Sequence, residues 1–266
     1  MQSALRVHYF QHIIHEGYGS PEQYLKQQKG AVLSHTEFFA LQEGQLATDL
    51  PAYDEVDLLI VMGGVMSVND EHLYPWLKQE KQWIREFMAQ DKPVIGLCLG
   101  GQLIASSLGA QINKNHYEEI GWWSIFKVDG AAQHDPTRHI FDFPDDLLAL
   151  SWHNETFELP EGAVLLAGSA ACSRQAYQFK HNVLAFQFHP EITPINLALF
   201  LEEKPDMENK DGTYIQSFHD LLYTSVDTFK PANEMLNRAI DFVLEATAAT
   251  KHVTSLKPDT ATNLQY

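Results

Sequence analysis

The chain has 266 residues, of which 45% are hydrophobic and 20% are charged, and its formal net charge is −17. This length can bury one good-sized α/β core, and the composition is ordinary for a globular protein. The negative charge would repel phosphate backbones and anionic lipid, and no apolar run approaches the roughly 18 residues that cross a bilayer. We therefore expect no nucleic-acid partner and no membrane partner.

The start of the chain and its cysteines bear on where the protein works. The first ten residues lack the charged start, long apolar stretch and small-residue cleavage site of a signal peptide. The sequence contains two cysteines, Cys98 and Cys172, which are too few for a disulfide framework and fit a reducing compartment. These features predict a cytoplasmic protein.

The first half of the chain predicts a parallel sheet covered by helices. Apolar residues at spacings of three and four predict a helix over Leu73–Met88, with Pro75 in its first turn. Buried strands before and after this helix indicate a right-handed crossover between parallel strands, so the predicted fold class is α/β with a mostly parallel central sheet. The predicted strands are Ala4–Tyr9, Ala31–His35, Val56–Met62 and a run that starts at Pro93.

The second half predicts further strands of the same sheet, or of a hairpin layer beside it. After them, Glu202–Gly212 is charged and contains proline and glycine, which predicts an exposed loop. A helix is predicted over Pro231–Thr247, so we expect a single catalytic domain over residues 1–247 and a polar C-terminal tail over 248–266. The predicted strands are Gly121–Val128, Leu147–Trp152, Ala163–Ala167, Gln175–Phe179 and Val183–Phe188.

One cysteine lies between a predicted strand and a predicted apolar helix. Residues 93–102 read PVIGLCLGGQ, in which Cys98 has Gly96 and Gly100 two positions away on either side. This pattern is typical of a nucleophile elbow, a tight turn that lifts its central side chain above the sheet. The N–H groups at the start of the helix favour the nucleophilic thiolate. A lone match also fits an inert, buried cysteine, which is what we expect of Cys172.

A histidine with a nearby acid follows another predicted strand. Residues 186–191 read FQFHPE, and Pro190 favours extended backbone at His189, so that Glu191 can lie on the same side. A thiol nucleophile needs a histidine to exchange its proton and an acid to fix the tautomer of that histidine. We therefore predict Cys98 as nucleophile, His189 as base and Glu191 as the residue that orients the base.

Other histidines carry no prediction of function. His8, His12 and His15 are close together near the N-terminus, but no carboxylate or cysteine lies at ligand spacing with them. The sequence also contains no glycine-rich phosphate-binding loop. We expect neither a metal nor a cofactor.

With Cys98 in GLCLGGQ and His189 in QFHPE, the chain resembles class I glutamine amidotransferases, in particular stand-alone proteins similar to the glutaminase domain of GMP synthetase. The resemblance runs from about Leu58 to Ile192 and implies a flavodoxin-like sheet. Three further segments fall in the order typical of the family, and they are Met62–Asp70, Glu119–Trp122 and Ser151–Pro160.

The resemblance also implies roles for residues around the nucleophile. The backbone N–H groups of Gly64 and Leu99 would bind the oxyanion of the tetrahedral intermediate. Gln102 would help to hold the substituents on the α-carbon of a glutamine substrate. Asn154 and Glu155 would line the same pocket, although an ordinary polar loop is nearly as good an interpretation of that segment.

Two departures from the family pattern affect these roles. Val65 stands where the family usually has proline, which leaves the geometry of the oxyanion loop less constrained. The pair Asn154 and Glu155 replaces the usual Gly-Asp, which changes the expected substrate contacts.

The resemblance implies hydrolysis of the γ-amide of glutamine or of a γ-glutamyl compound through a thioester. The segment after Ile192 is too short for a nucleotide-activating domain, so any ammonia acceptor would be a separate synthetase subunit. Two alternatives stay open at this point. The protein could be a γ-glutamyl peptidase without ammonia transfer, or a non-enzymatic sensing or stress-response protein on the same fold.

Overall fold

The computed structural model describes residues 4–129, 139–202, 207 and 210–255. Nine strands of this described part form one sheet in the order β2-β1-β3-β4-β9-β8-β7-β5-β6. The strands are β1 (Arg6–Gln11), β2 (Val32–Glu37), β3 (Leu58–Val61), β4 (Val94–Leu97), β5 (Ile112–Lys127), β6 (Asp146–Phe157), β7 (Ala163–Gly168), β8 (Ala176–Phe179) and β9 (Val183–Phe186). The helices are α1 (Pro21–Gln28), α2 (Trp76–Ala89), α3 (Leu99–Ser107), α4 (Pro194–Glu202), α5 (Phe218–Leu222) and α6 (Val226–Ser255).

The sheet has a parallel part and an antiparallel part. Strands β2, β1, β3, β4 and β9 pair in parallel, whereas β8, β7, β5 and β6 add antiparallel pairs. The carboxyl ends of the parallel strands therefore meet at one edge of the sheet, which is where open α/β sheets place their sites. The predicted α/β class with a central sheet flanked by helices is confirmed, and the strand ends at this edge lead directly into the predicted catalytic segments.

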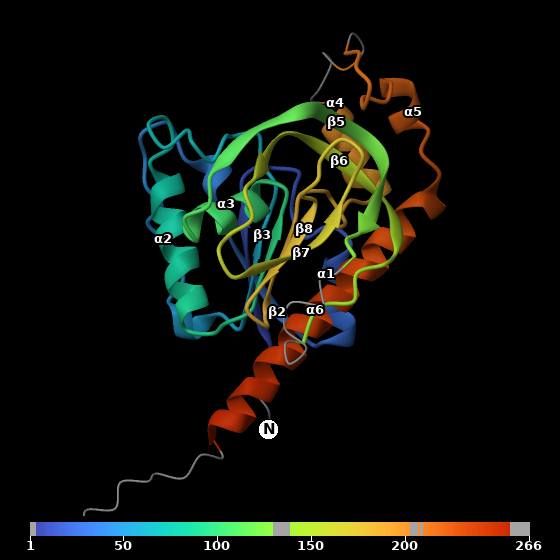
Figure 1. Cartoon of the computed structure of the whole chain (residues 1–266). Helices are drawn as coiled ribbons and strands as arrows, with labels where there is room; N and C mark the ends of the chain where they lie inside the picture. The colour runs from blue at the N-terminus through green and yellow to red at the C-terminus, as the bar shows by residue number, and fades with distance from the viewer. Residues whose placement is uncertain (1–3, 130–138, 203–206, 208–209, 256–266) are drawn as a thin grey trace, which may run out of the picture.

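Alternation along the parallel strands divides the core between two faces of the sheet. On β3, Leu58 and Ile60 belong to one hydrophobic cluster, and Leu59 and Val61 belong to the other. The first cluster includes buried residues of α1 and α6, and the second includes those of α2 and α3. Figure 1 shows α2 and α3 on one side of the sheet and α6 on the opposite side.

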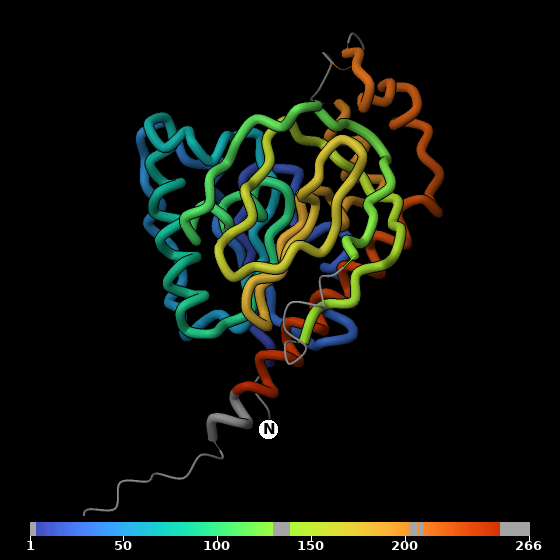
Figure 2. The backbone as a smooth tube through the Cα atoms, in the orientation of Figure 1, coloured from blue at the N-terminus to red at the C-terminus, as the bar shows by residue number. Residues whose placement is uncertain are grey.

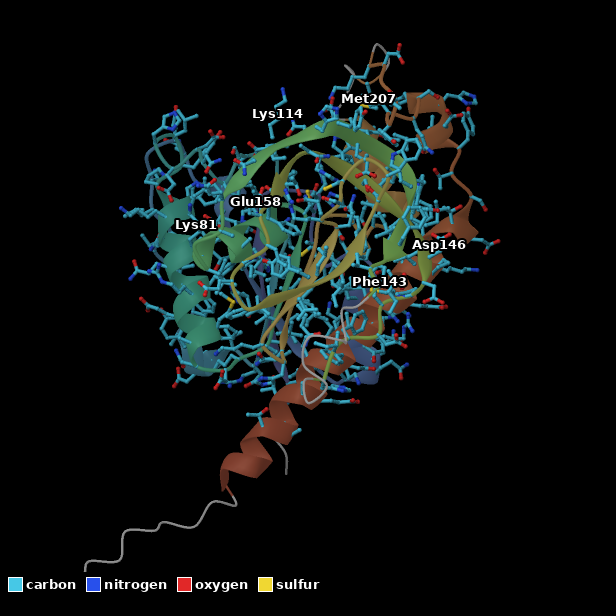
Figure 3. All side chains as sticks on the ribbon, in the orientation of Figure 1. Lys81, Lys114, Phe143, Asp146, Glu158 and Met207 are labelled. Carbon is cyan, nitrogen blue, oxygen red and sulfur yellow. The ribbon has the colours of Figure 1, made fainter. Side chains whose placement is uncertain are left out.

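The hairpin of β5 and β6 is longer than the sequence predicted. Strand β5 starts at Ile112 rather than at residue 121, and β6 runs to Phe157 rather than to residue 152. The added part of β5 arches over the end of the sheet (Figure 1) and is polar on both sides, so it carries no apolar alternation. Lys114 and Asp146 are exposed on this hairpin (Figure 3).

The boundaries of two helices differ from prediction. Helix α2 begins at Trp76, three residues after the predicted start, with Pro75 as its N-cap residue. Helix α6 continues through the predicted domain boundary at residue 247 (Figure 2) and ends at Ser255, so the first residues of the predicted tail are helical (Figure 1). Residues 256–266 and most of the predicted loop Glu202–Gly212 lie outside the described residues. No helix in the described ranges is both long and apolar enough to cross a membrane.

The buried side chain of His8 makes the stability of the fold depend on pH. The side chain is buried on β1, where its Nδ1 lies 2.8 Å from Ser34 Oγ and its Nε2 lies 3.1 Å from Thr36 Oγ1. Burial, together with the charge of His35, lowers the pKa of His8 to about 4. Because the folded-state pKa lies below the ordinary value of 6.5, the contribution of neutral His8 to stability is complete above pH 6.5 and is lost as the pH falls toward 4.

We expect the stability advantage of the wild-type protein over His8→Gln to shrink by up to about 3 kcal/mol between pH 7 and pH 4, since each unit of pKa shift is worth about 1.36 kcal/mol. Urea unfolding of both proteins at a series of pH values measures this difference. A difference that stays constant with pH would contradict the prediction.

Candidate active site

Cys98 lies in a strained turn at the end of β4. Its φ of 49° is in the left-handed region, and its backbone N–H donates to Phe186 O at 2.8 Å. A Cβ atom on Gly100 would lie 2.0 Å from Val61 O, and one on Gly96 would lie 2.7 Å from the backbone of Gly100. Both glycines are therefore required for α3 to start this close to the sheet. The turn has the geometry of the predicted nucleophile elbow.

His189 lies between Cys98 and Glu191. Its Nδ1 is 2.8 Å from Glu191 Oε1, and its ring lies close enough to the Cys98 side chain for that side chain to affect its pKa. Burial by itself would lower the pKa of His189, but the neighbouring Glu191 carboxylate and the Cys98 sulfur raise it well above its usual value. The structure thus brings together the three side chains that the sequence predicted as a catalytic set.

The segment after β9 is held from two sides. The N–H of His189 donates to Leu150 O on β6 at 2.8 Å. From α6, the side-chain amide of Asn233 donates to Pro190 O at 2.7 Å and to Ile192 O at 3.0 Å. These bonds fix the backbone on both sides of Glu191, and hence the position of its carboxylate.

A cavity of about 210 Å³ opens above the Cys98 side chain. It brings together every predicted site residue except Glu191, which lies behind His189. The lining residues that the sequence predicted are Gly64, Cys98, Leu99, Gln102, Asn154, Glu155 and His189.

Gln102 and Gln187 form a buried link beneath the cavity. The side-chain amide of Gln102 donates to Glu155 O and to Gln187 Oε1, both at 3.1 Å. Gln187 in turn directs its own amide toward Cys98 Sγ at 3.8 Å. The sequence prediction missed Gln187, although its position two residues before His189 on the same strand end placed it near the sulfur. Both N–H groups of Gln102 are engaged, so its side-chain oxygen is the group that remains for a substrate.

Asn154 and Glu155 lie on strand β6 and not in the loop that the sequence suggested. Opposite them, the pairing register of β5 shifts between Lys114 and Glu119, which is a bulge that brings Glu118 to the cavity. Glu155 is also fixed by its side chain, which accepts from Ser67 Oγ at 3.1 Å. Asn154 and Glu155 are therefore presented by a strand of the central sheet.

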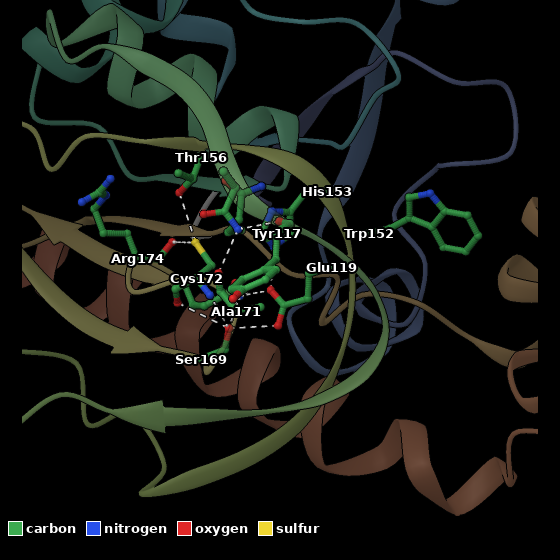
Figure 4. A network of polar contacts seen from close by, with 12 residues as sticks. Tyr117, Glu119, Trp152, His153, Thr156, Ser169, Ala171, Cys172 and Arg174 are labelled. Carbon is green, nitrogen blue, oxygen red and sulfur yellow. Dashed lines mark hydrogen bonds and ion pairs between the residues drawn. The ribbon is translucent and has the colours of Figure 1, made fainter. Parts of the chain in front are cut away.

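A buried polar network supports β6 from behind (Figure 4). His153 Nε2 lies 3.0 Å from Glu119 Oε2, and its Nδ1 lies 3.1 Å from Glu155 O. The Glu119 carboxylate also accepts from Ser169 Oγ at 2.9 Å and from Gln175 Nε2 at 2.6 Å. The sequence prediction assigned no role to Glu119, because nothing in one sequence reveals that these residues meet.

Cys172 lies beside this network and away from the cavity (Figure 4). Its Sγ is 3.3 Å from Thr156 Oγ1 and 3.4 Å from Arg174 O. Burial raises the pKa of the Cys172 thiol, which keeps it in the unreactive form. This environment agrees with the prediction of an inert cysteine.

The model of the family described as glutamine amidotransferase class-I matches residues 16–199, which is more than half of the chain. The chain belongs to this family. It is 33% identical over 242 residues to the glutamine amidotransferase-like protein YfeJ of Salmonella typhimurium, covering 89% of this chain and 96% of that protein. It is 30% identical over 172 residues to a subunit of the glutamine-hydrolyzing GMP synthase of Thermoplasma volcanium, covering 61% of this chain and 80% of that relative.

A solved structure shares the class I glutamine amidotransferase fold. The chain superposes on a glutamine amidotransferase from Thermotoga maritima with a TM-score of 0.76 and 26% identity, over 92% of this chain and 100% of that one. The family and the fold that the sequence resemblance implied are thereby confirmed.

The cavity of this family member is acidic. Glu16, Glu118 and Glu155 line it, whereas no lysine or arginine of the described residues does. Glu118 is paired with Lys210, and the Glu155 carboxylate accepts a hydrogen bond from Ser67 Oγ. A positively charged group on a ligand would be favoured here.

The contact of α3 with β3 can be tested by Gly100→Ala. We expect a loss of more than about 3 kcal/mol in the free energy of unfolding, because the added Cβ meets a backbone oxygen that cannot move aside cheaply. Gly17→Ala is the matched control, since its Cβ would make an ordinary contact of 3.5 Å with Tyr9 Oη. Its free energy of unfolding should change by less than about 1 kcal/mol. Equal effects of the two changes in a denaturant titration would contradict the prediction.

Proposed function

We propose that the protein hydrolyses the γ-amide of glutamine or of a γ-glutamyl compound through a thioester on Cys98. The observation that supports this most is the placement of His189 between Cys98 and Glu191 at an elbow that opens into a cavity. A buried imidazolium beside a thiol stabilises the thiolate, and the raised pKa of His189 favours that ion pair.

In the first half of the reaction, the Cys98 thiolate attacks the amide carbon and forms a C–S bond. The carbonyl oxygen becomes an oxyanion, which the N–H groups of Gly64 and Leu99 would bind. His189 then gives its proton to the amide nitrogen, the C–N bond breaks, and ammonia or an amine leaves. The γ-glutamyl group remains on Cys98 as a thioester.

In the second half, water takes the place of the leaving amine. His189, now neutral, accepts a proton from the water as its oxygen attacks the thioester carbon. The C–S bond breaks, glutamate leaves, and the thiolate and imidazolium are restored. Glu191 keeps Nδ1 of His189 protonated throughout, so that Nε2 faces the reacting atoms.

The cavity also suggests how the glutamyl group is held. The side-chain oxygen of Gln102 and the carboxylates of Glu16 and Glu155 are acceptors suited to the α-ammonium group of glutamate. One relative is named as one of the subunits of a glutamine-hydrolyzing GMP synthase, so we further propose that ammonia passes to a separate synthetase subunit. In that case hydrolysis without the partner would be the basal reaction.

The proposed roles predict an order of effects. Cys98→Ala should abolish glutamate release, and His189→Ala should be nearly as damaging. Glu191→Gln should leave about 10- to 100-fold more turnover than either, since an orienting acid contributes less than groups that bond or transfer protons. Glu191→Gln should also move the alkaline limb of the pH–rate profile to lower pH, because it removes the carboxylate that raises the pKa of His189.

Glutamate release and a pH–rate profile for each purified variant check this order. Cys172→Ala is the control and should keep full activity, because Cys172 lies outside the cavity. Full activity in Cys98→Ala would contradict the proposed mechanism. An unmoved alkaline limb in Glu191→Gln would contradict the role of Glu191.

The acidic cavity predicts that the α-ammonium group is required for efficient turnover. Glutarate monoamide, which lacks that group, should be cleaved at least about 10-fold more slowly than glutamine, because unpaired buried polar groups cost about 1–3 kcal/mol. An amide of α-linked glutamate should also be a poor substrate. Comparable kcat/KM values for all three amides would contradict the γ-glutamyl assignment.

A further inference from the structure

His12 is buried directly beneath the loop that carries Gly64. It follows β1, and neither its side chain nor that of its partner Glu80 on α2 has exposed surface. The imidazole ring lies nearly parallel to the rings of Phe38 and Trp76, with ring-centroid distances of 5.6 and 5.7 Å and interplanar angles of 15° and 18°, and those two rings also stack on each other at 4.8 Å. His12 is therefore part of a buried aromatic cluster.

Both nitrogens of His12 face hydrogen-bond acceptors. Nε2 lies 3.0 and 3.2 Å from the two carboxylate oxygens of Glu80, whereas Nδ1 lies 3.0 Å from Gly63 O and 3.2 Å from Met62 O. Burial alone would lower the pKa of His12, but the Glu80 carboxylate and the Gly63 carbonyl raise it above its usual value. The ring is therefore an imidazolium that donates from both sides.

The bond to Gly63 O constrains the neighbouring N–H. The carbonyl of Gly63 and the N–H of Gly64 belong to one planar trans peptide, so they point in opposite directions. With the carbonyl held toward His12, the Gly64 N–H is directed away from it. Gly64 lines the cavity together with Cys98 and Leu99. A flip of this peptide would turn the N–H inward and leave the His12 donor facing no oxygen of Gly63.

We propose that His12, held by Glu80, is a positioning residue that fixes the Gly63–Gly64 peptide with its N–H toward the cavity before substrate binds. This inference rests on the proposed function, in which Gly64 binds the oxyanion. The sequence led us to expect a loosely held oxyanion loop, because Val65 stands where the family usually has proline. Under this proposal the loop is not loose, since the buried His12 side chain supplies the restraint that a proline ring would otherwise provide.

The proposal predicts a selective loss of turnover. His12→Leu should lower kcat for glutamate release by about 100-fold, the effect of losing one oxyanion donor, with little change in KM. Alkylation of Cys98 by iodoacetamide should proceed at the wild-type rate, because displacement of iodide forms no oxyanion. His12→Asn places an amide N–H near the position of Nδ1 and should recover kcat to within about 10-fold of wild type.

A second buried histidine provides the matched control. His8→Leu removes an imidazole from the same strand region but outside the cavity, and its kcat should equal that of the wild-type protein. Glu80→Gln tests the same idea without removing the ring: it should lower kcat without slowing alkylation. This variant decides the question if His12→Leu does not fold.

Several results would overturn the inference. One is an unchanged kcat in His12→Leu or, if His12→Leu does not fold, an unchanged kcat in Glu80→Gln. Another is a loss of alkylation as large as the loss of turnover, which would indicate a general distortion of the site. Both leave the proposed function intact as long as the wild-type protein releases glutamate. A wild-type protein inactive on all γ-glutamyl amides would instead overturn the proposed function, and this inference with it.

Discussion

The close approach of α3 to the sheet is the constraint on which the site depends. Gly100 lies so near Val61 O that no other residue fits, and this contact sets where the helix begins relative to β3 and β4. The backbone must then turn sharply at Cys98, which it does with a positive φ. Strain of this kind persists only where the surrounding packing determines it. The buried clusters on both faces of the sheet supply that packing.

Three buried histidines in and near the cavity are each paired with a carboxylate, which offsets the cost of removing the ring from water. A polar or charged group taken out of water is tolerated when hydrogen-bond partners satisfy it. In three histidines of the described residues, a carboxylate faces one side of the ring. The other side of the ring faces a backbone oxygen in His12 and His153, and the side chain of Cys98 in His189. The pairs are His12–Glu80, His153–Glu119 and His189–Glu191.

Sequence reasoning succeeded where a local pattern determines geometry. The glycines around Cys98 and the proline after His189 act within a few residues, and α/β patterning places both segments at one sheet edge. The pattern could not reveal Glu80 as the partner of His12, because 68 residues separate them and only the docking of α2 joins them. The polar arm of β5 was missed for a different reason: its side chains lie outside the core, so burial left no periodic signal.

The hydrogen bonds from Asn233 to the segment around Glu191 join a late part of the chain to an earlier one, so this segment cannot be fully held until α6 has been synthesised. All segments that line the cavity have been translated by residue 200, yet the helix that holds this segment and covers one face of the sheet lies at 226–255. A nascent chain lacking α6 exposes the apolar face formed by residues such as Leu58 and Ile60. The segment around Glu191 therefore gains its hydrogen bonds from Asn233 only once α6 has left the ribosome and docked.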